Sequence, residues 1–218
     1  CRLRYCDTIG FETPYTIEKQ IYDLASKVKL PMELHCHNDL GMAIANSVAG
    51  AKGALEAGVD AYINVTVNGI GERSGQADLL GTAIALQFGN GYAKKYKIGD
   101  KFDLKFAWAM ARYTAQAFKV PIPINQPGVG ANAFAHESGI HADCALKDRH
   151  NYELYDYMLI GRTEEVCEPT GRTITTGEYG GMAGFKYVYN NLGIKFADED
   201  TARYILNLVQ YANAQNQQ

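Results

Sequence analysis

The first hundred residues repeat a pattern in which a short apolar run, a loop and an amphipathic segment follow one another. Apolar runs bounded by turn residues predict strands at 2–6, 32–36 and 61–67. Apolar positions at helical spacing predict that helices follow them, at about 16–28, 40–57 and 76–88. Thr16 is the expected N-cap of the first helix, and Gly58 is the expected stop of the second. Strand–helix units at this spacing predict a parallel sheet with right-handed crossovers.

The second half of the chain departs from this repeat. The pattern predicts one amphipathic helix over 103–119, and the prolines within 120–129 predict an extended linker. Further helices are expected at 133–147 and 200–214, with a mixed, glycine-rich segment at 152–195 between them. The polar tail after the last helix, rich in Gln and Asn, is expected to fray.

The strand–helix units are too few to close a (β/α)8 barrel, which takes about 250 residues. They fit either a small open sheet or the last part of a barrel whose earlier strands are absent. The chain starts at Cys1 rather than at a methionine, inside an apolar strand pattern. We therefore expect it to be a piece of a longer protein.

Composition and charge narrow the class of protein. A hydrophobic content of 47% and a charged content of 21% are typical of a globular domain. The formal net charge of −3 gives no basic surface for nucleic acid or for an anionic membrane. No apolar stretch reaches the roughly 18 residues of a membrane span. The five cysteines are scattered and odd in number, so we expect reduced thiols in a cytoplasmic protein.

The segment His-Cys-His-Asn-Asp, residues 35–39, is the first candidate for chemistry. Side chains alternate along a strand, so His35 and His37 are expected to share one face and to converge on one divalent metal. Their position at the carboxyl end of a strand is where α/β barrels keep their catalytic groups. A third protein ligand is needed, and Asp7 and Glu72 are the acidic residues at the other strand ends.

Two loops that follow the other strands are weaker candidates. Thr8 could hold a substrate carboxylate, although a plain Asp/Thr turn is the simpler interpretation. Residues 68–75 contain three glycines, which let the backbone approach a ligand, but they lack the phosphate-loop pattern. Within this loop, Glu72 and Arg73 could either form a buried ion pair that orders the loop or take a direct part in catalysis.

A third candidate lies in the post-repeat region. His136 and His141 are five residues apart and cannot share one helix face, so different roles are expected for them. A histidine that titrates near neutrality is a natural general acid or base. Cys36, Cys144 and Cys167 lack metal-ligand spacing and are expected to pack in the core.

Together these motifs resemble a known family. The segments HCHND, VNGIGERSG and AFAHESGIHADCALKDRHNYELYD occur in the order typical of the acetyl-CoA-dependent Claisen-condensing enzymes of the DRE-TIM metallolyase superfamily. These include homocitrate synthase, 2-isopropylmalate synthase and citramalate synthase. The resemblance runs continuously from residue 1 to about residue 162.

The resemblance implies condensation of acetyl-CoA with a metal-bound 2-oxo acid, then thioester hydrolysis, in amino-acid biosynthesis. The metal would be Zn, Mn, Mg, Fe or Co and would polarise the ketone. By the resemblance, His35 and His37 bind this metal and Thr8 holds the substrate carboxylate. His141 matches a catalytic histidine delivered to the neighbouring subunit of a homodimer with domain exchange, and Tyr152 matches a tyrosine that works beside it.

The loop residues are assigned with the same family in view. Glu72 and Arg73 are candidate catalytic residues, and Gly69 and Gly71 are candidates for binding acetyl-CoA. The expected partners are thus a 2-oxo acid, acetyl-CoA and a second copy of the chain, with no nucleic acid and no membrane.

The resemblance also implies an α/β fold class. Residues 1–102 would be the C-terminal part of a TIM barrel, its last three βα units. Residues 103–130 would be a helix and a proline-rich linker, and residues 131–218 a mainly helical post-barrel subdomain that acts as a lid.

Departures from the family pattern limit these assignments. The family's first barrel strand carries an Arg-Asp-Gly motif with the carboxylate metal ligand, and a catalytic glutamate follows in mid-barrel; this chain matches neither. We therefore expect the 218 residues alone to be inactive. Ile70 in the glycine loop favours a homocitrate-synthase-like enzyme that takes 2-oxoglutarate. Residues 176–181 replace a segment common in the family and leave room for a Re-type citrate synthase, which uses oxaloacetate.

Other functions stay open at this point. A 2-isopropylmalate or citramalate synthase would share the same motifs. A hydroxyacyl-CoA lyase of the superfamily also has the paired histidines, but residues 69–75 and 136–141 argue against it. A non-enzymatic interaction module is the third alternative, because a partial barrel leaves an unpaired sheet edge.

Overall fold

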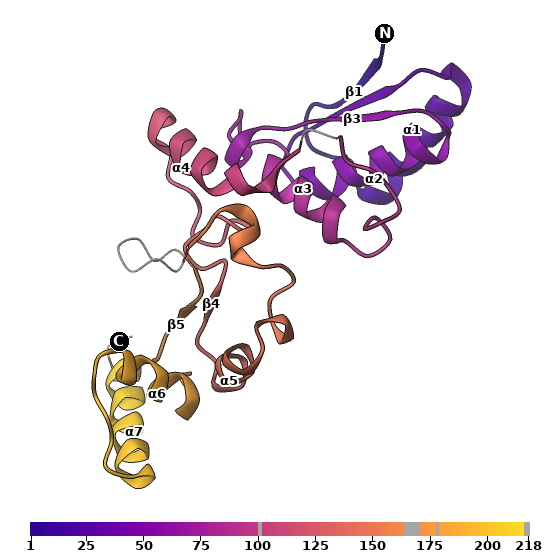
Figure 1. The fold of residues 1–218 in the computed structure, drawn as a ribbon. Helices are drawn as coiled ribbons and strands as arrows, with labels where there is room; N and C mark the ends of the chain where they lie inside the picture. Colours follow the sequence, from indigo (N-terminus) through magenta and orange to yellow (C-terminus); the bar gives the residue numbers. More distant parts are fainter. Residues whose placement is uncertain (100–101, 164–170, 178, 216–218) are drawn as a thin grey trace. The chain divides into compact units, whose positions relative to one another are not determined.

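A computed structural model describes residues 1–99, 102–163, 171–177 and 179–215 of the chain. The chain divides into two compact units (Figure 1). The first unit comprises Cys1–Ile122 and Pro127–Val129, and the second comprises Pro123–Gln126 and Gly130–Gln218.

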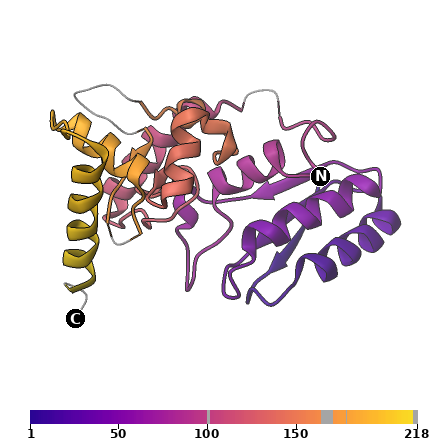
Figure 2. The same ribbon diagram turned by 90° about the horizontal axis from the view of Figure 1, so that it is seen from below.

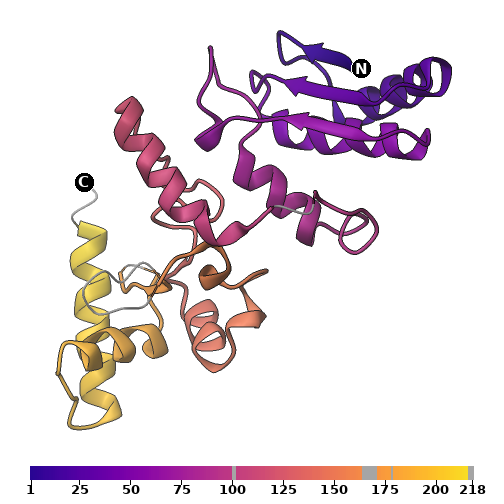
Figure 3. The ribbon, with the colours of Figure 1, turned by 45° about the horizontal axis from the view of Figure 1, so that its top comes forward.

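The first unit contains the predicted parallel sheet. The strands β1 (Leu3–Asp7), β2 (Met32–Cys36) and β3 (Ala61–Asn64) pair in that order, all parallel (Figure 3). The α/β prediction is confirmed. The third strand is shorter than the expected 61–67, because Val67–Gly69 form a 3-10 turn in which Asn68 takes the left-handed φ of 60°.

Helix α1 (Pro14–Val28) confirms the first predicted helix but corrects its cap. The N-cap is Thr13 and not Thr16. Thr16 is the third helical residue and completes a capping box, in which each threonine oxygen accepts from the backbone N–H of the other. The helix begins earlier than expected because Pro14, which has no N–H to satisfy, suits the first helical position.

The next two helices begin later than the pattern predicted. Helix α2 (Ala43–Glu56) starts after a turn in which Gly41 has a φ of +73° and the Asn38 side chain accepts from the Ala43 N–H at 3.1 Å. Helix α3 (Leu79–Phe88) starts after Asp78, whose carboxylate accepts from the Gly81 N–H at 2.7 Å. Asp78 therefore caps α3, whereas the N-cap of α2 is Met42 and Asn38 satisfies the first N–H of that helix from the preceding turn.

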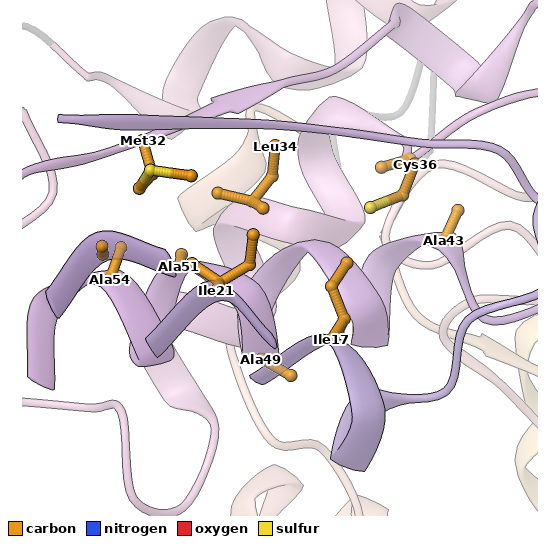
Figure 4. Packing of buried hydrophobic residues seen from close by; sticks show 11 residues of the cluster. Ile17, Ile21, Met32, Leu34, Cys36, Ala43, Ala49, Ala51 and Ala54 are labelled. Carbon is orange, nitrogen blue, oxygen red and sulfur yellow. The ribbon is translucent and has the colours of Figure 1, made fainter. Parts of the chain in front are cut away.

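One face of the sheet is apolar and packs on helices (Figure 4). Met32, Leu34 and Cys36 point from β2 toward Ile17 and Ile21 of α1. Alanines and glycines of α2 complete this core, and they allow a close approach: a Cβ on Gly53 would lie 2.3 Å from the Glu18 carbonyl oxygen. The small residues thus place α2 directly against α1.

The opposite face of the sheet is polar. Glu33 of β2 is buried and pairs with Arg2 and Arg4, the latter at 2.5 Å. Arg2 also lies over the Tyr62 ring of β3. Because side chains alternate along β2, Glu33 shares this face with His35 and His37.

The first unit ends in the short helix η2 (Leu104–Phe106), followed by α4 (Ala107–Phe118). Together they confirm the helix predicted at 103–119. Asn68, at the turn after β3, donates from its side-chain amide to the Ala111 carbonyl of α4 at 2.9 Å. This bond ties the glycine loop to α4.

The second unit combines helices with a small parallel ladder, β4 (Ala135–His136) paired with β5 (Thr173–Ile174). Its helices are α5 (Gly139–Lys147), η3 (Arg149–Asn151), η4 (Tyr157–Ile160), α6 (Met182–Asn191) and α7 (Glu199–Gln215). Figure 2 shows α6 beside the long yellow α7, where Phe185, Ala202 and Leu206 form a core.

One prediction for this unit is wrong in part. A helix was expected from residue 133, but it begins only at Gly139, because residues 135–136 pair with β5 instead. The predicted last helix is confirmed by α7, and residues 216–218 of the expected frayed tail lie outside the described residues. Among the described helices, none combines the length and the apolar character that crossing a membrane would need.

Candidate functional site

The carboxyl end of β2 brings His35 and His37 together, as predicted. Their ring centroids lie 5.0 Å apart and the ring planes meet at 87°. His35 closes the β2 ladder opposite Asn64 of β3, and His37 forms a bridge with Gln76 just before α3. Two imidazoles at this spacing can contribute nitrogens to one small ligand.

Asn64 is a member of the site that the sequence interpretation missed. It is the in-register partner of His35 on β3, and its Oδ1 lies 2.8 Å from His35 Nδ1. The signal was a polar residue at the end of an apolar strand, next to a strand that ends in histidines. Recognising that Asn64 pairs with His35 requires the register between β2 and β3, which the sequence pattern does not provide.

His37 has an unusual environment for a polar ring. The residue is only 5% exposed, and within the described residues its Nδ1 is buried without a hydrogen-bond partner. A buried nitrogen without a partner costs about 1–3 kcal/mol. A cation bound at this nitrogen would remove that cost, so the histidine pair fits a divalent metal.

Within the residues that the structure describes, no third metal ligand accompanies these histidines. The described part of the chain contains no group of three or more His, Cys, Asp or Glu side chains that could hold a metal. Asp7, one of the acidic candidates, is buried, and its two carboxylate oxygens accept from the Phe11 and Glu12 N–H groups at 3.0 and 3.3 Å. These contacts make Asp7 the organiser of the loop between β1 and α1.

Arg73 joins the loops that follow all three strands of the sheet. Its Nε and Nη2 donate to the two Asp39 carboxylate oxygens at 2.9 and 3.1 Å, and Nη2 also donates to the Thr8 carbonyl at 2.5 Å. The predicted alternative of a buried Glu72–Arg73 ion pair is wrong, because both side chains are exposed and Arg73 pairs with Asp39. Arg73 lies in the exposed loop that follows β3, and its side chain contacts Asp39 in the loop that follows β2.

Arg73 and Asp39, which we call the Arg73–Asp39 clamp, each stabilise the charged form of the other. Hydrogen bonds from Arg73 hold the pKa of the Asp39 carboxyl below its ordinary value of 3.8, and Asp39 raises the pKa of Arg73. The clamp therefore keeps both groups charged over the whole neutral range. It also brings the Thr8 backbone close to the HCHND segment, at the same end of the sheet as His35.

The glycine loop is a tight turn. Gly69 and Gly75 have φ angles of +68° and +87°, and a Cβ on Gly75 would lie 2.1 Å from the Gly69 carbonyl oxygen. A Cβ on Gly71 would approach the Gln76 side chain to 3.0 Å. The loop therefore requires these glycines for its own geometry, and the binding role predicted for Gly69 and Gly71 stays a prediction.

In the second unit, the structure brings His141 and Tyr152 together. Their ring centroids lie 4.2 Å apart with a tilt of 32°, and both side chains are exposed. His141 lies on α5, whereas Tyr152 follows η3, and a short reversal of the chain connects them. The two residues that the family resemblance pairs are therefore neighbours that face solvent.

A buried ionic cluster lies beside this pair, and the sequence did not predict it. Glu153, next to Tyr152, has a side chain only 3% exposed. Its carboxylate accepts from Arg172 at 2.5 and 3.2 Å and lies 3.2 Å from His136 Nε2. This cluster connects the Tyr152 segment to β4 and to the start of β5, and it gives His136 a buried partner whereas His141 is exposed.

The cysteine side chains differ in how exposed they are to solvent. Cys36 is buried in the core, as predicted, and burial raises the pKa of its thiol to about 11. Cys6 is exposed and Cys144 is partly buried. Cys167 lies outside the described residues.

Comparison with known proteins identifies two family domains along the chain. Residues 1–109 match the family model described as HMGL-like. Residues 129–216 match the model described as homocitrate synthase post-HMGL domain-like. The two matches correspond to the strand–helix region and to the region that carries His141 and Tyr152.

Curated relatives carry names of condensing synthases. The chain is 53% identical over 215 residues to a citrate (Re)-synthase of Dehalococcoides mccartyi, covering 98% of the chain and 52% of the relative. It is 35% identical over 199 residues to 2-isopropylmalate synthase 2 of Caldanaerobacter subterraneus, covering 91% and 47%. It is 35% identical over 198 residues to (R)-citramalate synthase CimA of Methanocaldococcus jannaschii, covering 91% and 36%.

The chain thus spans about half the length, or less, of the curated relatives it matches. The family model over its first half, the post-HMGL model over its second half and the names of these relatives agree with one another. The chain belongs to the HMGL-like family, within the acetyl-CoA-dependent condensing enzymes of the DRE-TIM superfamily.

Proposed function

We propose that the full-length protein condenses the acetyl group of acetyl-CoA with oxaloacetate, as a Re-type citrate synthase. The observation that carries this proposal is the 53% identity to a citrate (Re)-synthase, against 35% for the isopropylmalate and citramalate synthases. The paired histidines at the carboxyl end of β2 would hold the divalent cation that such a condensation needs.

A divalent cation would be held by His35 and His37, with a carboxylate from another part of the full-length protein. When bound, such a cation polarises the ketone of a 2-oxo acid as a Lewis acid. Imidazole nitrogens suit Zn or Fe better than Mg, which prefers oxygen ligands. The strand–helix units of residues 1–102 would then form the last part of a TIM barrel, with the metal at its catalytic face.

The remaining residues have roles in binding and proton transfer. Thr8 would bind a carboxylate of the 2-oxo acid, and the Arg73–Asp39 clamp holds its backbone. Glu72 is exposed in the same loop, and we propose that it takes part in catalysis on the bound acyl-CoA. Gly69 and Gly71 would let that acyl-CoA lie close to the backbone.

His141 and Tyr152 would move protons, and His141 has the chemistry of a general acid or base near neutral pH. Removal of a methyl proton from acetyl-CoA gives the enolate, whose carbon bonds to the ketone carbon, and water then cleaves the thioester. We propose that His141 and Tyr152 serve the active site of the partner in a homodimer. The expectation of a cytoplasmic location stays with this proposal.

The test is CoA release by the full-length protein with acetyl-CoA and a panel of 2-oxo acids. We expect the highest kcat/KM with oxaloacetate, and lower values with 2-oxoglutarate, pyruvate and 2-oxoisovalerate. The His141→Ala variant should lose about 100-fold or more in kcat, whereas the exposed His150→Ala variant should retain its activity. No CoA release with any of the acids would refute the proposal.

A second candidate is a homocitrate synthase that takes 2-oxoglutarate. Its support is Ile70 in the glycine loop and the post-HMGL domain match. A preference for 2-oxoglutarate in the same assay would favour it over citrate synthesis. Cleavage of a hydroxyacyl-CoA without added acetyl-CoA would favour a lyase instead.

A further inference from the structure

Asn64 contacts one of the two proposed metal ligands without being a ligand itself. We propose that Asn64 is a positioning residue, which holds the His35 imidazole in the one tautomer that can bind a metal through Nε2. This inference rests on the proposed metal role of His35 and His37, and it names a residue that sets the affinity of that site.

The chemistry of the contact determines the tautomer. Asn64 Oδ1 lies 2.8 Å from His35 Nδ1, and an amide oxygen can only accept a hydrogen bond. His35 Nδ1 must therefore carry the proton. In a neutral imidazole the other nitrogen, Nε2, then carries the lone pair that a metal requires.

The geometry of the sheet holds Asn64 in place before any ligand arrives. His35 and Asn64 are direct partners in the parallel ladder between β2 and β3, so the main chain fixes the distance between their Cα atoms. Both side chains are partly buried. The His35 ring is thus oriented in advance, edge-on to His37, which reduces the entropy lost when a metal binds.

His37 provides a contrast within the same site. Its Nδ1 has no hydrogen-bond partner among the described residues, so no such contact selects its tautomer. The structure therefore gives an orienting partner to one of the two imidazoles. Removing Asn64 should affect the His35 bond to the metal and leave His37 as it is.

The side chain of Asn64 is neutral, and this determines how substitutions at this position should change metal affinity. A hydrogen-bond acceptor behind a metal-binding histidine raises the basicity of the imidazole, and a carboxylate does so more strongly than a neutral acceptor. The Asn64→Asp variant keeps the acceptor and adds negative charge, whereas Asn64→Leu removes the acceptor and keeps a side chain branched at the same atom. Asn64→Leu should therefore weaken metal binding, whereas Asn64→Asp should not.

The experiment is a Co²⁺ titration of the full-length protein, followed by its visible absorption. Loss of an outer partner of a metal ligand typically weakens binding about 10–100-fold, and we expect this for Asn64→Leu. Asn64→Asp should bind as tightly as the wild type or more tightly. The exposed residue Asn190 provides the matched control, and Asn190→Leu should bind Co²⁺ like the wild type.

A second measurement needs no variant. Nitrogen-15 spectra of histidine-labelled, metal-free protein should show His35 with its proton on Nδ1. Wild-type Co²⁺ affinity in Asn64→Leu, equal weakening in Asn64→Asp and Asn64→Leu, or a proton on Nε2 of His35 would each overturn the inference. Unchanged Co²⁺ binding by His35→Ala would instead refute the metal site on which the proposed function depends.

Discussion

The two pairs of residues to which we assign chemistry are held by different means. His35 and His37 lie at the end of β2, where main-chain pairing with both neighbouring strands fixes their position. His141 and Tyr152 lie on a helix and on the irregular segment that follows it, beside a buried carboxylate with two partners. A backbone ladder holds the first pair, whereas side-chain contacts support the second.

This difference predicts which mutations each pair tolerates. A ladder of backbone bonds survives most side-chain substitutions, since every residue except proline can contribute to it. A buried ion cluster depends on a few specific groups, and the loss of one leaves the others without compensation. We therefore expect the second unit to be the more sensitive to polar substitutions, and the first to those that change packing.

The largest expected effect on the free energy of unfolding comes from substitution of Glu153. Glu153→Ala would remove the buried partner of Arg172 and His136, which should lower the free energy of unfolding of this unit by about 3–5 kcal/mol. Urea unfolding of the full-length protein measures this change. Asp143→Asn is the matched control, because its pair with Lys147 is on the surface and should not affect the midpoint. Equal midpoints for both variants would contradict a supporting role of the cluster.

A packing substitution tests the first unit. Gly53→Ala places a Cβ 2.3 Å from the Glu18 carbonyl, so α1 and α2 must separate, at a cost of about 1–3 kcal/mol. Helix propensity alone predicts the opposite sign, a gain of about 1 kcal/mol. Gly99→Ala is the control, since a Cβ there meets no atom within 4 Å. A more stable Gly53→Ala protein would show that the helices are not in close contact.

The smallest effect is expected at the exposed clamp. Because the folded-state pKa of Asp39 lies below its ordinary value of 3.8, the Arg73–Asp39 pair contributes stability above this pH and loses it as the pH falls through the folded-state pKa. The difference in Tm between the wild type and Asp39→Asn should therefore be small and constant near about pH 6, and it should shrink below pH 3.8 and disappear once the pH is below the folded-state pKa. A difference that persists in acid would mean that Asp39 acts through packing instead.

The fold of the first unit was largely predictable from the sequence. Apolar runs and helical spacing located every strand and helix of the sheet region within a few residues. The errors lay at the end of β3, where Val67–Gly69 form a turn, and at helix starts, where the apolar pattern gives no signal. There Thr13 and Asp78 cap their helices, and Asn38 accepts from the first N–H of α2. In the second unit, β4 and β5 are two residues long and 38 positions apart, too short for any periodicity to reveal them.

The site was predictable only in its local parts. His35 and His37 are two positions apart, so the alternation of a strand sufficed to bring them together. Asn64 reaches His35 across a strand register, and Glu153 reaches Arg172 across 19 residues of chain. Such contacts depend on how the chain folds back, which residue spacing does not encode.

The alternation of β2 links correct folding to a correctly built site. Met32, Leu34 and Cys36 face the helices (Figure 4). Glu33 and His35 face the other way, because side chains alternate along a strand. A slip of one residue in strand pairing would exchange these sets, burying two imidazoles and a carboxylate in the core while exposing its apolar side chains. Such a molecule would be much less stable, so the burial that selects the register of β2 also selects the face on which the two histidines lie.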